Sequence, residues 1–210
     1  NCETIEEVIA SDQSIRISKI NQQLHFLVCD STGNKAVIEF NEGKQVVYTG
    51  DDLVYPVLEN DTYKTSLWKN LNNSSCRFNK AIKLINLYEE NDNSGAVDYA
   101  FEVLEEVKLD GSWSIVYDIK NKQINFNTAS NRRIKTINFA RFNFDCHSDP
   151  LVFDLRNKSE RNITDRFEAY SNELNRAKFD DGLKTNGIFL PQAIYDQFIN
   201  YPRQCTCEDG

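Results

Sequence analysis

The most constraining feature of this sequence is a set of three short apolar runs joined by turn sequences. The runs are His25–Asp30, Ala36–Phe40 and Gln45–Thr49, and they are rich in Val, Ile and Phe. Ser31-Thr32-Gly33-Asn34 and Asn41-Glu42-Gly43 separate them, and such Gly- and Asn-containing links are typical of β-hairpins. The pattern therefore predicts an antiparallel meander of three strands.

Helical periodicity surrounds this meander. Residues 4–10 carry an apolar stripe and a capping box, in which the side chains of Thr4 and Glu7 each satisfy a backbone N–H at the helix start. After a short extended piece that ends at Asn60, apolar residues recur at helical spacing in three further segments. These expected helices are Thr62–Leu71, about Ser75–Glu89, and Gly95–Val107.

A second set of strands follows these helices. Trp113–Ile119 and Gln123–Thr128 predict a hairpin across the polar turn Lys120-Asn121-Lys122. The segment Lys135–Phe144 alternates apolar and polar residues, as a half-buried strand does. The second half of the chain therefore contains another antiparallel unit.

The tail from Asn162 has helical spacing again. Thr164 is the expected N-cap, and Pro191 suits the first turn of a last helix, where its missing N–H costs nothing. Strands, then helices, then strands is the order of a layered body in which helices pack outside antiparallel sheets. We therefore predict the α+β class.

Composition argues against several classes of function. The formal net charge of −8 opposes nucleic acid as a partner, because phosphate binding needs an excess of Lys and Arg. The two histidines and six irregularly spaced cysteines form no metal-ligand motif, and a Gly-rich phosphate loop is missing. We expect no metal, no cofactor, and thiols that are buried or idle. The cysteines are Cys2, Cys29, Cys76, Cys146, Cys205 and Cys207.

Arg77 falls in the first turn of the second expected helix after the meander. A cation there faces the positive end of the helix dipole, which is unfavourable by roughly a few tenths to 1 kcal/mol unless an anionic group compensates. Arg77 is therefore a candidate contact for an anion or a carbonyl group. The alternative is a surface arginine that pairs with a nearby carboxylate.

Asn60 lies where the extended apolar segment meets a helix. At such a junction its amide can point into a cleft and donate a hydrogen bond to a developing oxyanion. The alternative is that Asn60 caps the helix that follows, a role for which Asn is equally suited. The local pattern alone favours the cap.

Cys2 is a conceivable nucleophile, because a thiol at a chain start can use its own α-amine as the base. Two features oppose this role. Asn1 precedes Cys2, and Cys2 leads into the amphipathic helix at residues 4–10 rather than into a strand edge. His25 opens a strand and His147 lies in a loop, and both are expected to be structural.

Four local patterns occur in one order along about residues 1–145. They are His25-Phe26-Leu27-Val28-Cys29-Asp30 with Gly33 and Ala36-Val37-Ile38-Glu39-Phe40, then Val57-Leu58-Glu59-Asn60-Asp61-Thr62-Tyr63, then Ser75-Cys76-Arg77-Phe78, then Trp113-Ser114-Ile115-Val116-Tyr117-Asp118. In this order they resemble segments of the choloylglycine hydrolase and penicillin V acylase family. The resemblance covers the meander, the candidate Asn60 and Arg77, and the later hairpin.

That resemblance implies a four-layer αββα sandwich of the N-terminal-nucleophile hydrolase type and the hydrolysis of linear, non-peptide amide C–N bonds. In such enzymes the thiolate of an N-terminal Cys attacks the amide carbon while its α-amine moves the proton. Asn60 matches the family's Asn that contacts the intermediate, and Arg77 matches its active-site Arg. These two residues are therefore the catalytic candidates, and a small-molecule amide is the expected substrate.

The sequence also departs from the family. The family's nucleophilic Cys lies upstream of the matched portion, so an upstream segment or chain is expected to supply it and the chain alone should be inactive. Residues 1–150 would form the C-terminal portion of the sandwich, and residues 151–210 a helical extension packed on it. Glu59 replaces the usual Thr, and the segment from Asn60 to Arg77 is short, which argues against bile-salt specificity.

Other interpretations stay open. A non-catalytic binding or interaction domain would keep the sandwich without the chemistry, and an unrelated α+β domain would match the motifs by chance. Self-association into a homo-oligomer also stays open. A periplasmic or secreted location is preferred, although the Asn-x-Ser/Thr sites follow as readily from an Asn-rich composition.

Overall fold

The structure, a computed structural model, describes residues 2–15, 24–73, 75–89, 95–145, 147–155, 157 and 161–204. Its helices are α1 Ile5–Ala10, α2 Tyr63–Asn72, α3 Arg77–Leu87, α4 Ala96–Val107, α5 Asn172–Asn186 and α6 Gln192–Gln204. Its strands are β1 His25–Cys29, β2 Lys35–Asn41, β3 Lys44–Thr49, β4 Ser114–Asp118, β5 Gln123–Thr128, β6 Asn131–Asn138, β7 Leu151–Val152 and β8 Glu168–Ala169. The predicted α+β class is confirmed.

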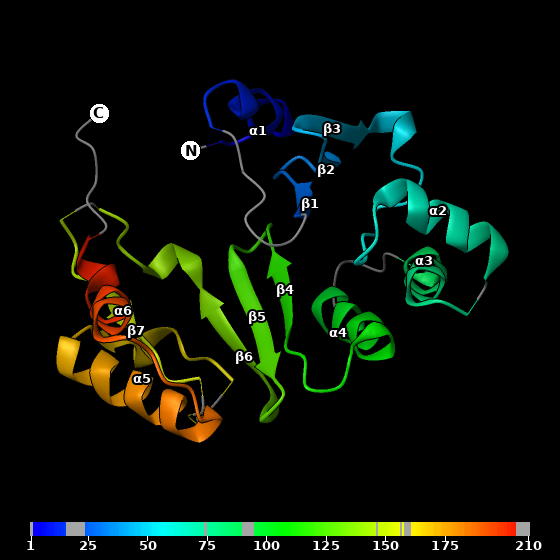
Figure 1. Cartoon of the computed structure of the whole chain (residues 1–210). Helices are drawn as coiled ribbons and strands as arrows, with labels where there is room; N and C mark the ends of the chain where they lie inside the picture. The colour runs from blue at the N-terminus through cyan, green and yellow to red at the C-terminus, as the bar shows by residue number, and fades with distance from the viewer. Residues whose placement is uncertain are drawn as a thin grey trace.

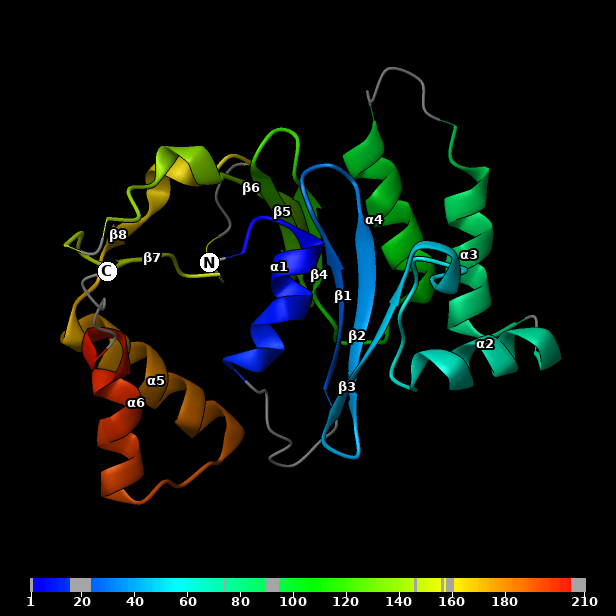
Figure 2. The same ribbon diagram turned by 90° about the horizontal axis from the view of Figure 1, so that it is seen from above.

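Two three-stranded antiparallel sheets occupy the middle of the molecule (Figures 1 and 2). Sheet A has the order β1-β2-β3, and sheet B has the order β4-β5-β6. Helices α2, α3 and α4 lie on one side of these sheets, and α5 and α6 lie on the other (Figure 1). No helix in the described ranges is both long and apolar enough to cross a membrane.

Sheet A is the predicted meander, and its central strand β2 pairs antiparallel with both neighbours. The β1–β2 and β2–β3 turns contain Gly33 and Gly43, whose φ angles of +90° and +76° lie in the region that glycine adopts most readily. A 3-10 turn, η2 (Gly50–Asp52), follows β3 and leads the chain toward α2.

Alternate residues of β2 face two different hydrophobic clusters. Ala36 and Ile38 are buried with Ile5 of α1 on one face of sheet A. Val37 is buried with Tyr63 on the other face, in the cluster that also contains residues of α3. Because side chains alternate along a strand, both faces of β2 are covered, and sheet A separates α1 from α2 and α3.

The N-terminal helix begins as predicted. The Thr4 hydroxyl accepts a hydrogen bond from the Glu7 N–H, and a Glu7 carboxylate oxygen accepts one from the Thr4 N–H, both at 3.3 Å. Satisfying these two backbone donors stabilises a helix that is too short to persist by itself. One 3-10 turn, η1 (Ser11–Gln13), continues it.

Sheet B follows the pair of helices α3 and α4. The Tyr99 hydroxyl of α4 donates to the Leu84 carbonyl of α3 at 2.6 Å, and α4 packs on β4. The hairpin of β4 and β5 is confirmed, but β6 runs from Asn131 to Asn138 rather than from 135 to 144. It ends early because the Asn138 side chain accepts from the Ala140 N–H at 3.1 Å and starts the 3-10 turn η3, Phe139–Arg141.

The prediction of a helix from Asn162 is wrong. Residues 161–163 run parallel to β6 instead, where the Thr136 N–H donates to the Arg161 carbonyl at 2.7 Å and the Ile163 N–H donates to the Thr136 carbonyl at 3.0 Å. The Thr164 hydroxyl accepts from the Asn138 N–H at 2.9 Å, so it serves the sheet rather than a helix start. Pairing with a distant strand overrides the local helical spacing.

The helices of the tail begin later than expected. After the 3-10 turn η4, Thr164–Arg166, the chain forms β8, which pairs with β7. Helix α5 then starts at the cap Ser171, whose hydroxyl accepts from the Leu174 N–H at 3.0 Å. Pro191 immediately precedes α6, and its carbonyl accepts the first hydrogen bonds of that helix, close to the predicted first turn.

Candidate active site

Asn60 lies in an irregular loop between η2 and α2, and its side chain is exposed. The cap of α2 is Thr62, whose hydroxyl accepts from the Thr65 N–H at 3.4 Å. The alternative interpretation of Asn60 as the helix cap is therefore wrong. Within the described ranges the Asn60 side chain makes no hydrogen bond, so both groups of its amide stay available to a ligand.

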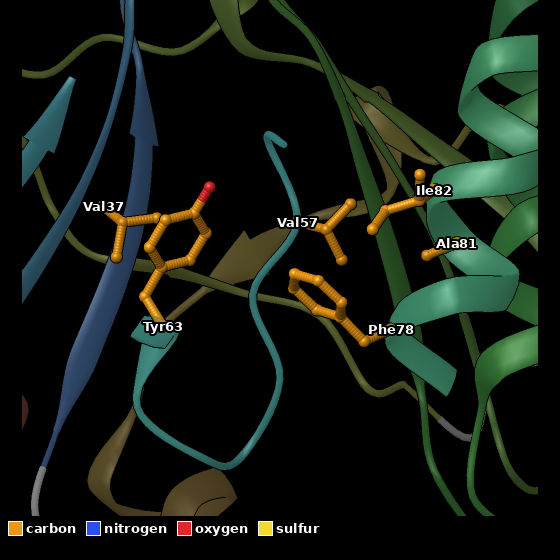
Figure 3. Packing of buried hydrophobic residues seen from close by; sticks show 6 residues of the cluster. All are labelled: Val37, Val57, Tyr63, Phe78, Ala81 and Ile82. Atoms are coloured by element: carbon orange, nitrogen blue, oxygen red, sulfur yellow. The ribbon is translucent and has the colours of Figure 1, made fainter. Parts of the chain in front are cut away.

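The loop that carries Asn60 is closed by Tyr63, the first residue of α2. The Tyr63 hydroxyl accepts from the Tyr55 N–H at 2.9 Å and donates to the Tyr55 carbonyl at 3.0 Å. Its ring is fully buried, lies 4.8 Å from the Tyr48 ring between centroids, and sits between Val37 and Val57 (Figure 3). Burial raises the pKa of the Tyr63 phenol above its ordinary value.

Glu39 anchors the same loop from sheet A. It lies on the face of β2 that holds Val37, is 5% exposed, and accepts the Tyr63 N–H on Oε1 at 2.6 Å. A carboxylate placed at a helix N-terminus compensates the positive end of the dipole. His25 Nδ1 lies 3.6 Å from the same oxygen, consistent with the structural role expected for this histidine.

Arg77 is the first residue of α3, as the helix-dipole argument requires. The preceding cap residue, Cys76, makes no side-chain capping bond, and the first turn of α3 contains no acidic residue. Arg77 is half-buried and pairs with no carboxylate in the part of the chain that the structure describes. The alternative of a surface arginine bridged to an acid finds no partner there, and the dipole is left uncompensated.

The start of α3 is held in place by Asn79. This side chain is 7% exposed, and its Nδ2 donates to the Asn70 carbonyl at 3.2 Å and to the Asn73 carbonyl at 2.6 Å. These bonds satisfy carbonyls at the C-terminal end of α2, where helical partners run out. They fix the short α2–α3 connection, and with it the backbone of Arg77.

Hydrophobic packing joins the Asn60 loop to the start of α3, and the charge of Lys69 lies close to the loop. Val57 of the loop packs against Phe78 and Ile82 of α3 in one buried cluster (Figure 3). Lys69 of α2 forms an ion pair with Asp61, and this hydrogen bond, followed by smaller attraction from Glu59 and Cys76, raises the Lys69 pKa. The Lys69 charge is therefore favoured by Asp61 and Glu59 on either side of Asn60, and to a smaller degree by Cys76 before Arg77.

Asn60 and Arg77 themselves are not hydrogen-bonded to one another. Neither lines the cavities of about 880, 770 and 350 Å³ that lie elsewhere in the described chain. In the same ranges, no three His, Cys, Asp or Glu side chains gather to hold a metal ion. Asn60 and Arg77 thus lie on backbone that neighbouring side chains hold at the surface, and neither side chain has a hydrogen-bond or ionic partner among the described residues.

The thiols do not complete this surface. Cys2 precedes α1, which packs on the face of sheet A opposite to Tyr63 and the Asn60 loop. Cys29 is a free, exposed thiol rather than a buried one, and Cys76 is half-buried beside Arg77. The remaining cysteines, Cys146, Cys205 and Cys207, lie outside the described residues.

Sequence reasoning missed the residues that hold the surface together, which are Glu39, Tyr63, Lys69 and Asn79. One signal was present for Glu39, because a carboxylate stands among the apolar residues of a strand that is otherwise buried. Buried carboxylates need a hydrogen-bonding partner, so such a position points to a specific contact.

Comparisons with known proteins found a match among solved structures. A scan against protein-family models found no match, and a search of the curated proteins found none either. Among solved structures, the chain is similar to penicillin V acylase from Agrobacterium tumefaciens, with a TM-score of 0.68 and 19% sequence identity. The match covers 81% of this chain, and the chain spans 64% of the length of that acylase. Over most of its length, the chain therefore shares the fold of that penicillin V acylase, as the resemblance predicted.

Proposed function

We propose that this chain is part of an amide hydrolase of the acylase type, which cleaves linear, non-peptide C–N bonds in small molecules. Asn60 and Arg77 form its half of the active site. The nucleophilic cysteine comes from an upstream segment or a separate chain, so residues 1–210 alone are inactive. The observation that carries the proposal is the fixed backbone around two polar side chains that have no described protein partner.

In the proposed amide hydrolysis, Asn60 and Arg77 act only as hydrogen-bond donors. A thiolate attacks the amide carbon, the carbonyl oxygen takes up negative charge, and the leaving amine takes a proton as the C–N bond breaks. Water then hydrolyses the thioester and releases the acid. The Asn60 amide and the Arg77 guanidinium are both donors, so they suit stabilisation of that oxygen or binding of the acyl carbonyl.

Cys2 is an unsuitable source of the thiolate in this proposal. Sheet A lies between α1 and the Asn60 loop, because alternate residues of β2 are buried with Ile5 on one face and with Tyr63 on the other. A nucleophile must come within roughly 3–3.5 Å of the carbon it attacks. The thiol must therefore approach from the side of α2 and α3.

The first test measures turnover by residues 1–210 on penicillin V, conjugated bile salts and N-acyl homoserine lactones, with a Cys2→Ser variant beside it. We expect no turnover by either protein. Thiol-dependent turnover that Cys2→Ser abolishes would overturn the assignment of the nucleophile to another segment or chain.

The second test measures binding, which needs no nucleophile. Phenoxyacetamide is titrated into the chain and followed by the NMR signals of side-chain amides and of Arg77. We expect Asn60→Ala and Arg77→Lys each to weaken binding by roughly five- to tenfold, the loss of about one charge-assisted or neutral hydrogen bond. The matched controls are Asn34→Ala, in the exposed β1–β2 turn, and Arg141→Lys, beside Asp165.

These controls should bind phenoxyacetamide as the unchanged chain does. Equal binding by the Asn60 and Arg77 variants would refute the assignment of both residues to the acyl site. Binding that depends on both residues, in a longer gene product that has no processable cysteine upstream, would instead favour a non-catalytic binding domain.

A further inference from the structure

A small cavity of about 350 Å³ lies at one end of sheet B, away from the candidate active site. Its floor includes Ile124 of β5 and Ile137 of β6, which are directly paired neighbours on one face of the sheet. Alternation along the strand places these residues on the face opposite to Asn127, which lines the cavity beside α3 and α4. The small cavity therefore opens on the side of sheet B that α4 does not cover.

Phenylalanine rings form the wall of this cavity. Phe139, Phe142, Phe144 and Phe167 all line it. The Phe139 and Phe144 rings lie 4.4 Å apart, and the Phe142 and Phe167 rings meet edge to face at 4.9 Å, measured between centroids. Phe139 and Phe144 remain 47% and 63% exposed, so aromatic surface is left uncovered at the mouth.

The charges that line the cavity have one sign. Asp145 and Asp149 lie at its exposed edge, and none of the described residues that line it is Lys or Arg. Asp149 makes no hydrogen bond or ion pair within the described ranges, and the Asp145 carboxylate accepts only a backbone N–H there, from His147 at 2.9 Å. Arg141 and Arg166 each adjoin a lining phenylalanine in the chain, but neither arginine lines the cavity, and Arg141 lies 4.0 Å from an Asp165 carboxylate oxygen.

We propose that this cavity binds an organic cation with apolar substituents, a quaternary or N-methylated ammonium group, between the Phe139–Phe144 wall and the carboxylates of Asp145 and Asp149. The negative faces of aromatic rings attract a cation that is too weakly hydrated to prefer water. The carboxylates add long-range attraction, and the aliphatic floor accepts the methyl groups. This site is separate from Asn60 and Arg77, and it does not depend on the proposed hydrolase activity.

The experiment compares choline with its neutral carbon isostere, 3,3-dimethylbutan-1-ol, by calorimetric or NMR titration of residues 1–210. The two probes have nearly the same shape, so the difference between them reports the charge. We expect choline to bind about tenfold more tightly than the alcohol, a ratio in the range of cation–π and carboxylate attraction combined.

Two variants test the wall and the charge separately. Phe144→Leu should weaken choline binding by roughly fivefold, because it removes a ring but keeps apolar volume. Asp149→Asn should weaken it by a similar factor, and both side chains are exposed enough to be replaced without unfolding the protein. The matched controls are Phe189→Leu, at a ring that is 98% exposed between α5 and α6, and Asp110→Asn, before β4.

Equal affinity for choline and the alcohol would overturn the proposal, because it would show a site for apolar groups only. So would choline binding that Phe144→Leu and Asp149→Asn leave at the level of the two controls. If neither probe binds and Phe144→Leu turns a dimer into a monomer in sedimentation, the wall is an interface between copies of this chain and the proposal is wrong.

Discussion

Lys135 lies on β6 opposite Phe126 and is 1% exposed. Its side chain makes no ion pair or hydrogen bond with the residues that the structure describes. Burial, and to a smaller degree the neighbouring charge of Arg133, lowers the Lys135 pKa. Burial of a lysine side chain is costly when it strips water from the ammonium, which is the main cause of this lowered pKa.

Lys135→Met should therefore raise the free energy of unfolding, by about 1–3 kcal/mol, because Met keeps the aliphatic length and removes the charge. Urea unfolding monitored by circular dichroism measures the change. Lys64→Met, on the exposed face of α2, is the matched control and should change stability by less than roughly 0.5 kcal/mol. A Lys135 variant that is less stable than the parent would mean that the ammonium has a stabilising partner.

The contact between Glu39 and Tyr63 could not be predicted from the sequence. Their hydrogen bond joins residues 24 positions apart, and no local pattern specifies such a contact. Asn60 and Arg77 were predicted as site residues because they stand in ordered motifs, whereas the side chains that hold them are recognised only once β2 and α2 are placed together. Taken residue by residue, the helix-dipole argument made Arg77 a candidate ligand contact, and the local pattern favoured Asn60 as a helix N-cap.

At the scale of elements, the start of α2 separates the two roles considered for Asn60. Thr62→Ala should destabilise the chain by about 1 kcal/mol, the usual cost of losing an N-cap side chain. Asn60→Ala should leave stability within roughly 0.5 kcal/mol of the parent, because it caps nothing. Paired thermal unfolding of the two variants checks this, and a larger loss for Asn60→Ala would restore it as the cap.

The elements also show where a sequence pattern is sufficient and where it fails. The meander and the helices α1 to α4 are set by local turns, caps and periodicity, and their predicted ranges hold to within about two residues at most ends. The errors fall on β6 and on residues 162–170. There the backbone of residues 161–163 pairs with β6 and Thr164 caps no helix, an outcome decided by chain segments about 26 residues apart.

At the scale of the whole molecule, the buried phenols make stability sensitive to alkali. Burial raises the pKa of both Tyr63 and Tyr48 above the ordinary value of 10.0, and the Glu39 charge adds to the shift at Tyr48. A raised folded-state pKa contributes stability that is fully present below the unfolded pKa. That contribution is lost as pH rises through the folded value.

The free energy of unfolding should therefore fall as the pH rises above about 10, beyond any change seen between pH 7 and 9. Tyr63→Phe should lower stability at pH 7 by about 1–3 kcal/mol through the two lost bonds to Tyr55, and should flatten the alkaline decline. Tyr117→Phe, at a ring that is 64% exposed, is the control. An alkaline decline of the same size in Tyr63→Phe would show that other groups cause it.

Both faces of β2 are covered, so the register of this strand decides which of its side chains enter which hydrophobic cluster. Ala36 and Ile38 belong to one cluster, and Val37 and Glu39 face the other way. A slip of one residue in the β1–β2–β3 register would exchange the two sets and turn Glu39 toward α1. The Tyr63 N–H would then lose its acceptor, and the loop with Asn60 would lose its anchor. Correct register of the β1–β2–β3 meander is therefore required for the Asn60 loop to take its place, because a meander paired one residue out of register removes the loop's anchor.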